Sequence, residues 1–345
     1  MQLPERQAYN SLLKKLDGDI AKIHRAIASS NPLSAWRTSG GTIIKMEADW
    51  RELENLGIRL IMNNDHDDFP PLLKEIPDAP LGIYVMGDAK ALIGQNIAIV
   101  GTRKATSMGL KIAGDFSRVL AKTDFNVVSG LALGIDAAAH AGTLLGNGAT
   151  VAVLPGGLDQ IYPANHRGLA EKILKQNGAL VSEYPPGSPS YPARFLERNR
   201  LVSGLSRATI VIEAPERSGA LATARLAAEQ NREVGAVPGP INSPSHKGTN
   251  ALIKSGAALI AEVADIFELI GFTPGALPLK IPKRNINLNP AETAIMDAIQ
   301  ALSPAANIDK IIDWCKLEPP VIQRHLTFLI IKDMIKEVGG KYELN

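Results

Sequence analysis

Two cationic side chains follow a short apolar run near the middle of this 345-residue chain. The run Ile97 to Val100 ends at Gly101, and a polar loop with Arg103 and Lys104 leads into the helix-like segment LKIAGDFSRVLAK. This pattern is typical of a β-strand, a tight turn and a helix. In an open parallel sheet such a turn lies at the carboxyl end of a strand, where backbone N–H groups and a helix N-terminus can hold a phosphate. We therefore expect an anion-binding turn here.

The loop from Pro155 to Leu169 joins two glycines to polar groups and an aromatic ring. These side chains are those of Asp159, Tyr162, Asn165, His166 and Arg167. The mixture suits a nucleotide better than a metal ion.

Arginines cluster further along, where Arg194, Arg198 and Arg200 lie within seven residues, next to Tyr191 and Phe195. Guanidinium groups bind phosphates and stack on flat rings, so the cluster predicts a surface for phosphates and bases. The alternative is an arginine-rich helix start whose cations pair with nearby carboxylates. The carboxylates available for such pairing are Glu183, Glu197 and Glu213.

Two groups of titratable residues could indicate other chemistry. Asp136 and His140 lie four residues apart on one helix face and could act as an acid–base pair. More often such a pair orders a loop, and no Ser or Cys nucleophile motif accompanies it. The segment 65–68, DHDD, could hold a metal ion, but adjacent ligands without a defined loop spacing favour a solvated turn.

Strand-like runs alternate with helix-compatible segments through the centre of the chain. The runs cover residues 97–100, 126–130, 149–157, 179–184, 208–214 and 233–239. This alternation predicts an α/β fold, an extended Rossmann-like parallel sheet covered on both faces, with several loops converging on one crevice. Neither G-x-x-x-x-G-K-[ST] nor G-x-G-x-x-G occurs, so we expect no standard nucleotide cofactor.

Periodicity and composition divide the chain into four regions. Residues 1–60 read as a small helical (SAM-like) domain, and 61–271 hold the alternating strands and helices. A Pro-rich linker covers 272–288. Residues 289–345 read as three helices followed by two strands around a Gly-Gly turn, which predicts a winged-helix domain.

Charge is unevenly distributed over these regions. Residues 91–284 hold 20 Lys and Arg against 14 Asp and Glu, whereas residues 285–345 hold 6 against 8. An anion-binding surface therefore belongs to the central region. The acidic winged helix lacks the usual electrostatic attraction to a duplex, so we favour a protein-interaction or packing role for it.

Composition also bears on the compartment. Cys315 is the single cysteine, which fits a reducing cytoplasm. The first residues have no apolar core of a secretory signal, and no run of about eighteen apolar residues occurs. We expect a cytoplasmic protein with no membrane segment.

Eight motifs between about Gly82 and Ile260 carry a resemblance. They are Gly101-Thr102-Arg103, SGLALGIDAAAH from Ser129, PGGLDQIYPANH from Pro155, SEYPPG from Ser182, RNRLVSGLS from Arg198, EAPERSGALATARLAA from Glu213, AVPG from Ala236 and GTNALIKSGA from Gly248. Together and in this order, they resemble the DprA/Smf family, the DNA-processing proteins of bacterial natural transformation.

The resemblance implies a binding protein and not an enzyme. Family members bind single-stranded DNA with an extended Rossmann domain, protect the incoming strand, help load RecA onto it and work as homodimers. Residues 61–271 would then be the DNA-binding domain, without cofactor or metal ion.

The resemblance also assigns residues. Arg103 matches the family's DNA-contacting arginine, in the turn that includes Gly101, Thr102 and Lys104, and Arg167 matches a second basic contact. The other expected nucleic-acid-binding residues are Ser129, Gly130, Arg198, Asn199 and Arg200, the last three in a motif that borders the same pocket.

An enzyme is the strongest competing interpretation. Nucleoside-monophosphate phosphoribohydrolases share a Rossmann-like sheet and a P-G-G turn, and they too lack a P-loop. Their turn continues P-G-G-x-G-T with a catalytic Glu nearby, whereas Leu158 and Asp159 follow Gly157 here. A pure interaction scaffold ranks third, because it would not need arginines at strand ends.

Overall fold

The computed structural model describes residues 2–28, 30–65, 67–272, 289–302, 306–331 and 334–344. These residues form two compact units, one ending at Phe272 and one beginning at Asn289. The expected linker, from residue 273 onward, lies outside the described residues. None of the helices in the described ranges is long and apolar enough to cross a membrane.

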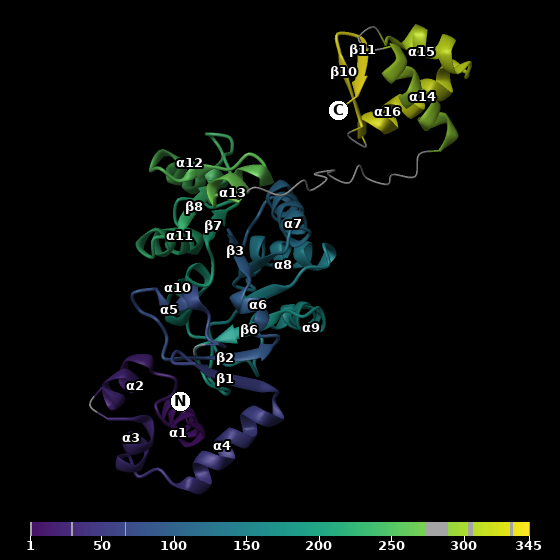
Figure 1. Ribbon diagram of the computed structural model, residues 1–345. Coiled ribbons are helices and arrows are strands. Elements are labelled where there is room, and N and C mark those ends of the chain that lie inside the picture. Colours follow the sequence, from purple (N-terminus) through teal and green to yellow (C-terminus); the bar gives the residue numbers. More distant parts are fainter. Residues whose placement is uncertain are drawn as a thin grey trace. The chain divides into compact units, whose positions relative to one another are not determined.

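A nine-stranded sheet forms the centre of the first unit, in the order β1-β2-β6-β5-β4-β3-β7-β8-β9 (Figure 1). Strands β3 to β9 pair in parallel, while β2 pairs antiparallel with both β1 and β6. The strands are β1 Ile58–Met62, β2 Gly82–Gly87, β3 Gln95–Val100, β4 Phe125–Ser129, β5 Thr150–Val153, β6 Ala179–Ser182, β7 Ala208–Val211, β8 Glu233–Ala236 and β9 Ala258–Leu259. The expectation of an α/β fold with a mostly parallel sheet is confirmed.

Helices cover both faces of this sheet, because successive side chains of a strand point to opposite faces. Ala98 and Val100 of β3 pack in a core with α5, α6, α10 and α11, whereas Ile97 and Ile99 pack with α7, α8 and α13. Figure 1 shows the two helical layers on either side of the strands. The helices are α5 Pro71–Lys74, α6 Lys90–Ile93, α7 Ser107–Ala121, α8 Ile135–Leu145, α9 Arg167–Lys175, α10 Pro192–Gly204, α11 Gly219–Glu229, α12 Lys247–Lys254 and α13 Val263–Leu269.

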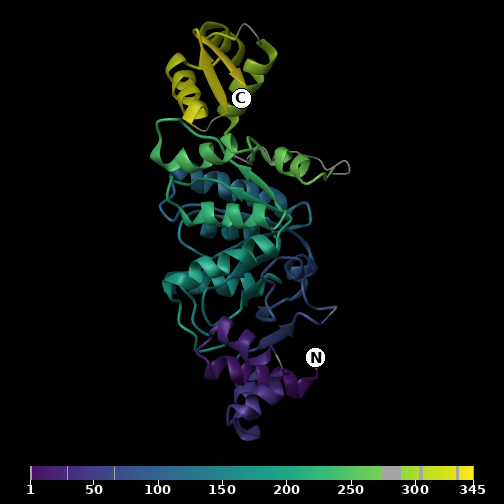
Figure 2. The same ribbon diagram turned by 90° about the vertical axis from the view of Figure 1, so that its left-hand side faces the viewer.

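Four helices precede the sheet and pack against its β1–β2 end, as both views show (Figures 1 and 2). They are α1 Leu3–Lys15, α2 Ile20–Ile27, α3 Pro32–Thr38 and α4 Ile43–Asn55. Helix α3 forms in a stretch that is rich in helix-breaking residues, NPLSAWRTSGGT from Asn31 to Thr42. Asn31 caps it by accepting a hydrogen bond from the Ser34 N–H at 2.8 Å, and Pro32 occupies the first helical position.

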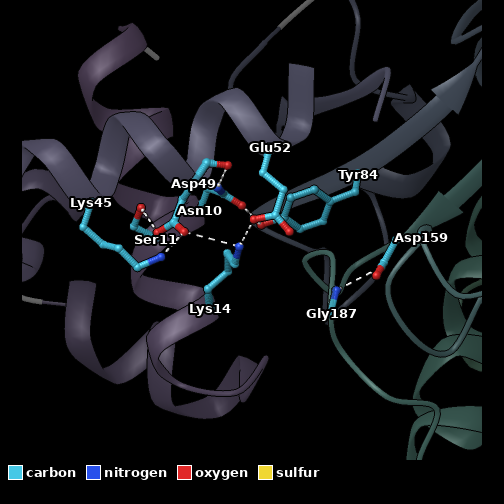
Figure 3. A network of polar contacts seen from close by, with 9 residues as sticks. All are labelled: Asn10, Ser11, Lys14, Lys45, Asp49, Glu52, Tyr84, Asp159 and Gly187. Carbon is cyan, nitrogen blue, oxygen red and sulfur yellow. Dashed lines mark hydrogen bonds and ion pairs between the residues drawn. The ribbon is translucent and has the colours of Figure 1, made fainter. Parts of the chain in front are cut away.

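A polar network around the buried Asp49 connects α1 to α4 and to the sheet (Figure 3). Asp49 of α4 accepts a hydrogen bond from Ser11 of α1 at 2.8 Å and pairs with Lys14 at 3.3 Å and with Lys45. Asn10 donates to the Asp49 carbonyl oxygen and accepts from the hydroxyl of Tyr84 in β2 at 3.0 Å. Helix α1 is therefore fixed to β2.

The second unit consists of three helices and a hairpin around its own apolar core. Its elements are α14 Pro290–Leu302, α15 Ile308–Cys315, α16 Pro319–Ile331, β10 Ile335–Val338 and β11 Lys341–Leu344. The two strands pair antiparallel, and Gly339 and Gly340 between them have positive φ angles, as a two-residue hairpin turn requires. The element order matches the sequence expectation.

Candidate nucleic-acid interface

The sheet changes winding direction beside β3, because β4 to β6 lie on one side of it and β7 to β9 on the other. In open α/β sheets, ligands bind at the carboxyl ends of the strands at such a point. A cavity of about 530 Å³ lies here. Its lining comes from the end of β3, the loop before α11, and the first turns of α10 and α11.

The turn after β3 brings Arg103 to this cavity. Thr102 N–H donates to the Glu213 carbonyl oxygen at 2.8 Å, and Lys104 N–H donates to Thr102 Oγ1 at 3.2 Å. A Cβ at Gly101 would lie 2.5 Å from Ile135, so only glycine fits this approach. Arg103 is exposed and pairs with no carboxylate in the described part of the chain.

Two aromatic rings form a wall of the cavity next to Arg103. The Arg103 guanidinium carbon lies 5.0 Å from the ring centre of Phe195. The ring of Tyr162 lies 5.4 Å from Phe195 at 75°, an edge-to-face arrangement. A flat cation and two rings thus lie together, although they come from two loops and the first turn of α10.

Arg198 is a buried residue of the cavity lining. Its side chain is 4 % exposed and donates to the carbonyl oxygens of Gly130, at 2.8 Å, and Val153. Burial lowers the pKa of Arg198 to about 10, the carboxylate of Asp136 opposes this, and Arg103 adds to it. Arg198 lines the cavity, but its guanidinium N–H groups donate to carbonyl oxygens at the ends of β4 and β5. In this geometry its main role is therefore to hold β4 and β5 in place.

Ser129 and Gly130 are buried under the same cavity. Ser129 Oγ donates to the Ile99 carbonyl oxygen at 2.7 Å, which ties β4 to β3. Gly130 N–H donates to Asp136 Oδ2 at 3.1 Å, and Gly130 lies against the Arg198 guanidinium. These positions fit a supporting role more closely than contact with a ligand.

Two of the expected residues lie away from the cavity around Arg103. Arg200 pairs with Glu183 and donates to the Asp78 carbonyl oxygen at 2.6 Å, and it lines a separate cavity of about 760 Å³. Arg198 and Asn199 of the same motif do line the cavity around Arg103, and Arg200 differs from them because residues two apart on a helix point in different directions. Arg167 is exposed at the first turn of α9 and lines neither cavity.

The N-terminus of α7 is not open to a phosphate, contrary to the expectation for this turn. Glu213, at the end of β7, is fully buried there, and its Oε2 accepts from Thr106 N–H at 3.0 Å and from Thr106 Oγ1 at 3.1 Å. A Cβ at Gly109 would collide with the same oxygen. The carboxylate therefore supplies the negative charge that this helix end favours.

The possible acid–base pair is not formed. Asp136 Oδ2 accepts from the N–H groups of Gly130 and Ala132, and burial raises the pKa of Asp136. His140 is hydrogen-bonded through Nδ1 to Thr150 Oγ1 at 2.7 Å instead. Asp136 thus orders the loop, as the sequence favoured.

The possible metal-binding segment also has another arrangement. Asp65 pairs with Arg6 at 2.7 Å and accepts from Met62 N–H, while His66 lies outside the described residues. No group of three or more His, Cys, Asp or Glu side chains placed to hold a metal ion occurs in the described ranges.

Sequence reasoning missed the opposite wall of the cavity. Arg217, Ser218 and Gly219 line it where α11 begins, and Arg217 is exposed. The available signal was a cation followed by Ser-Gly directly after a strand-like run, the same kind of pattern as at Arg103.

The chain was compared with known proteins. The family model described as DNA recombination-mediator protein A matches residues 60–271. Protein Smf of Escherichia coli is 44 % identical over 214 residues, which cover 62 % of this chain and 57 % of that protein. The chain thus matches little more than half the length of this curated relative.

Two solved structures are also similar. DNA processing protein A (DprA) from Streptococcus pneumoniae superposes with a TM-score of 0.61 at 30 % identity, over 76 % of this chain and 92 % of that one. DNA processing protein A from Helicobacter pylori, from a study of its single-stranded DNA binding mode, gives a TM-score of 0.55 at 32 % identity, over 61 % and 94 %. The family model covers more than half of the chain, and the relatives agree with it: the chain belongs to the DprA/Smf family of DNA-processing proteins.

Proposed function

We propose that this protein binds single-stranded DNA during recombination, in the cavity at the carboxyl ends of β3 and β7. The observation that carries the proposal is the stack of Arg103 on Phe195 beside Tyr162, in a cavity that also receives Arg217. Family membership supports it, since the relative from Helicobacter pylori is described by its single-stranded DNA binding mode.

The chemistry of the lining favours unpaired bases. Aromatic faces and guanidinium planes stack on bases that are separated from their neighbours, as in a single strand. In a duplex the bases remain stacked on one another. Arg103, Lys104 and Arg217 are exposed cations at strand ends, suited to the phosphates between those bases. Such contacts are tolerant of base identity, so binding would depend little on sequence.

The finer assignments are proposals of the same kind. We infer a cytoplasmic homodimer that protects the strand and helps to load RecA onto it, without being an enzyme. Residues 289–345 would form a winged helix that contacts protein, because the exposed side chains of α16 include Phe328, Thr327 and only one cation, Arg324, among its described residues. The helical domain 1–60 and the domain 61–271 would act together, as argued below.

The phosphoribohydrolase alternative fits the geometry less well. Asp159, which follows the P-G-G turn, accepts a hydrogen bond from Gly187 N–H at 2.9 Å and so ties two loops together (Figure 3). Glu213 fills the helix N-terminus that a nucleotide phosphate would use. Both groups are engaged in holding the fold.

Fluorescence anisotropy with labelled oligonucleotides tests the proposal. We expect tighter binding to single strands than to duplex, with log affinity falling by about 0.7 per contacted phosphate for each decade of salt. Arg103→Ala should weaken single-strand binding by about 1–3 kcal/mol, because it removes a charge-assisted, partly desolvated contact.

The matched control is Arg225→Ala, which removes an equally charged side chain from an exposed pair with Glu229 on α11. It should leave affinity unchanged. Unchanged affinity of folded Arg103→Ala would remove Arg103 from the site, and no binding to either form of DNA would favour the hydrolase, testable by base release from nucleoside monophosphates.

A further inference from the structure

Arg194 lies directly before Phe195 in the first turn of α10, but it serves a different surface. Its side chain is 8 % exposed and does not line the cavity around Arg103. The guanidinium stacks over the ring of Tyr184, 4.2 Å from its centre, and over Tyr191 at 5.1 Å. The buried guanidinium therefore contacts both rings.

The same guanidinium joins the N-terminal helices to α10. One terminal nitrogen donates to the Pro189 carbonyl oxygen at 2.9 Å, and the other donates to the carbonyl oxygen of Asp17 at 2.6 Å. Asp17 lies in the turn between α1 and α2, 177 residues earlier in the chain. Gly18 packs against this contact, since a Cβ there would lie 3.0 Å from Arg194 Nη2.

The turn between α1 and α2 is itself anchored. Helix α1, which precedes it, is fixed to α4 by Asp49 and to β2 by the bond between Asn10 and Tyr84 (Figure 3). A rigid connection thus runs from the sheet through α1 to the start of α10. Any rotation of that first helical turn would move Phe195 relative to Arg103, because adjacent helical residues share one backbone.

We propose that Arg194 is a positioning residue through which the α1–α2 turn holds the Phe195 stacking surface against Arg103. This inference rests on the proposed single-strand binding at that surface. It gives the N-terminal helices a part in DNA affinity without a DNA contact of their own. The guanidinium shape matters as well as its charge, because the fork donates to two carbonyl groups while the group also contacts two aromatic rings.

Two variants test the connection from its two ends. Arg194→Lys keeps the charge but loses the fork, and Gly18→Ala adds a methyl group against Arg194 at a φ of +72°. The matched control is Gly40→Ala, at a φ of +78° in the same helical region, where a Cβ meets nothing within 4 Å. The control carries similar backbone strain without touching Arg194.

The measurement is anisotropy with a labelled oligodeoxythymidine at several salt concentrations, together with thermal unfolding of each full-length variant. We expect Arg194→Lys and Gly18→Ala to lose about 3- to 30-fold in affinity with an unchanged salt slope. Gly40→Ala should bind as the wild type does, although its unfolding temperature falls as that of Gly18→Ala does.

Different outcomes contradict different statements. Wild-type affinity in folded Arg194→Lys and Gly18→Ala overturns the positioning role, while a weaker Arg103→Ala still supports the site. A salt slope reduced by about 0.7 in Arg194→Gln, which removes the charge, would make Arg194 a direct phosphate contact and would also overturn the role. Absence of single-strand binding by the wild type would overturn the proposed function itself.

Discussion

His140 should make the stability of the sheet depend on pH. The imidazole is fully buried in α8, and burial lowers its pKa from 6.5 to about 3, with the electrostatic effects of His166 and Arg198 adding to it. Thr150 Oγ1 donates to the Val127 carbonyl oxygen at 2.6 Å, so it accepts from His140 Nδ1–H. The buried Nε2 of His140 has no hydrogen-bond partner among the residues that the structure describes. The native protein therefore holds His140 neutral.

The sign and size of the effect follow from linkage. Because the native pKa is lower than that of the unfolded chain, the unfolded state binds the proton first as pH falls below about 6.5. The stability contributed by neutral His140 is complete above that pH and is lost towards pH 3. Between pH 7.5 and pH 5 the expected loss is about 2 kcal/mol, and it changes little with the native pKa as long as that stays below about 4.

The assay is urea unfolding of the wild type and of His140→Asn at pH 7.5 and pH 5. An asparagine amide can replace the Nδ1–H donor towards Thr150 without titrating. The free energy of unfolding should fall by about 2 kcal/mol more in the wild type than in the variant. His24→Asn, the same substitution at an exposed histidine, supplies the control. Equal pH dependence of wild type and His140→Asn would refute the reasoning.

Two further predictions separate supporting residues from binding residues. Arg200→Ala leaves the carboxylate of Glu183 buried without its partner, so the free energy of unfolding should fall by about 3 kcal/mol. Single-strand affinity should stay within about threefold of the wild type. A large loss of affinity without loss of stability would mean that Arg200 contacts DNA. A chain ending at Gly271 should keep its single-strand affinity in the anisotropy assay, because the cavity and its cations Arg103 and Arg217 lie before that residue. A large loss would mean that residues after Gly271 contact DNA.

The sequence predicted the parallel part of the sheet because local signals sufficed there. Runs such as Ile97 to Val100 are too short for helices, and the segments between them have helical periodicity. The addition of β1 and β2 to this sheet, through the pairing of β2 with β6, was not visible in the sequence. That pairing joins Tyr84 to Ser182 across nearly a hundred residues, and nothing local specifies it.

The candidate site was predictable in part for the same reason. The sequence indicates the cationic turn at Arg103 because Arg103 follows directly after a strand-like run. The structure places Phe195 and Tyr162 beside it. Composition could not tell which arginine of the α10 segment faces the cavity, since that depends on helix rotation. Nor could it show that Glu213, more than a hundred residues from Thr106, would occupy the N-terminus of α7.

Glu213 gives a physical reason to expect a polymer and not a mononucleotide as ligand. A Rossmann-like sheet usually offers one phosphate the N–H groups and dipole of the helix that follows the first strand. Here a buried carboxylate holds that position, so an incoming phosphate would meet repulsion and would have to displace two hydrogen bonds. Attraction must then come from exposed guanidinium groups and rings, and each such contact is weak in water. A ligand that repeats the same phosphate and base along its length can add several of them, which a single nucleotide cannot do.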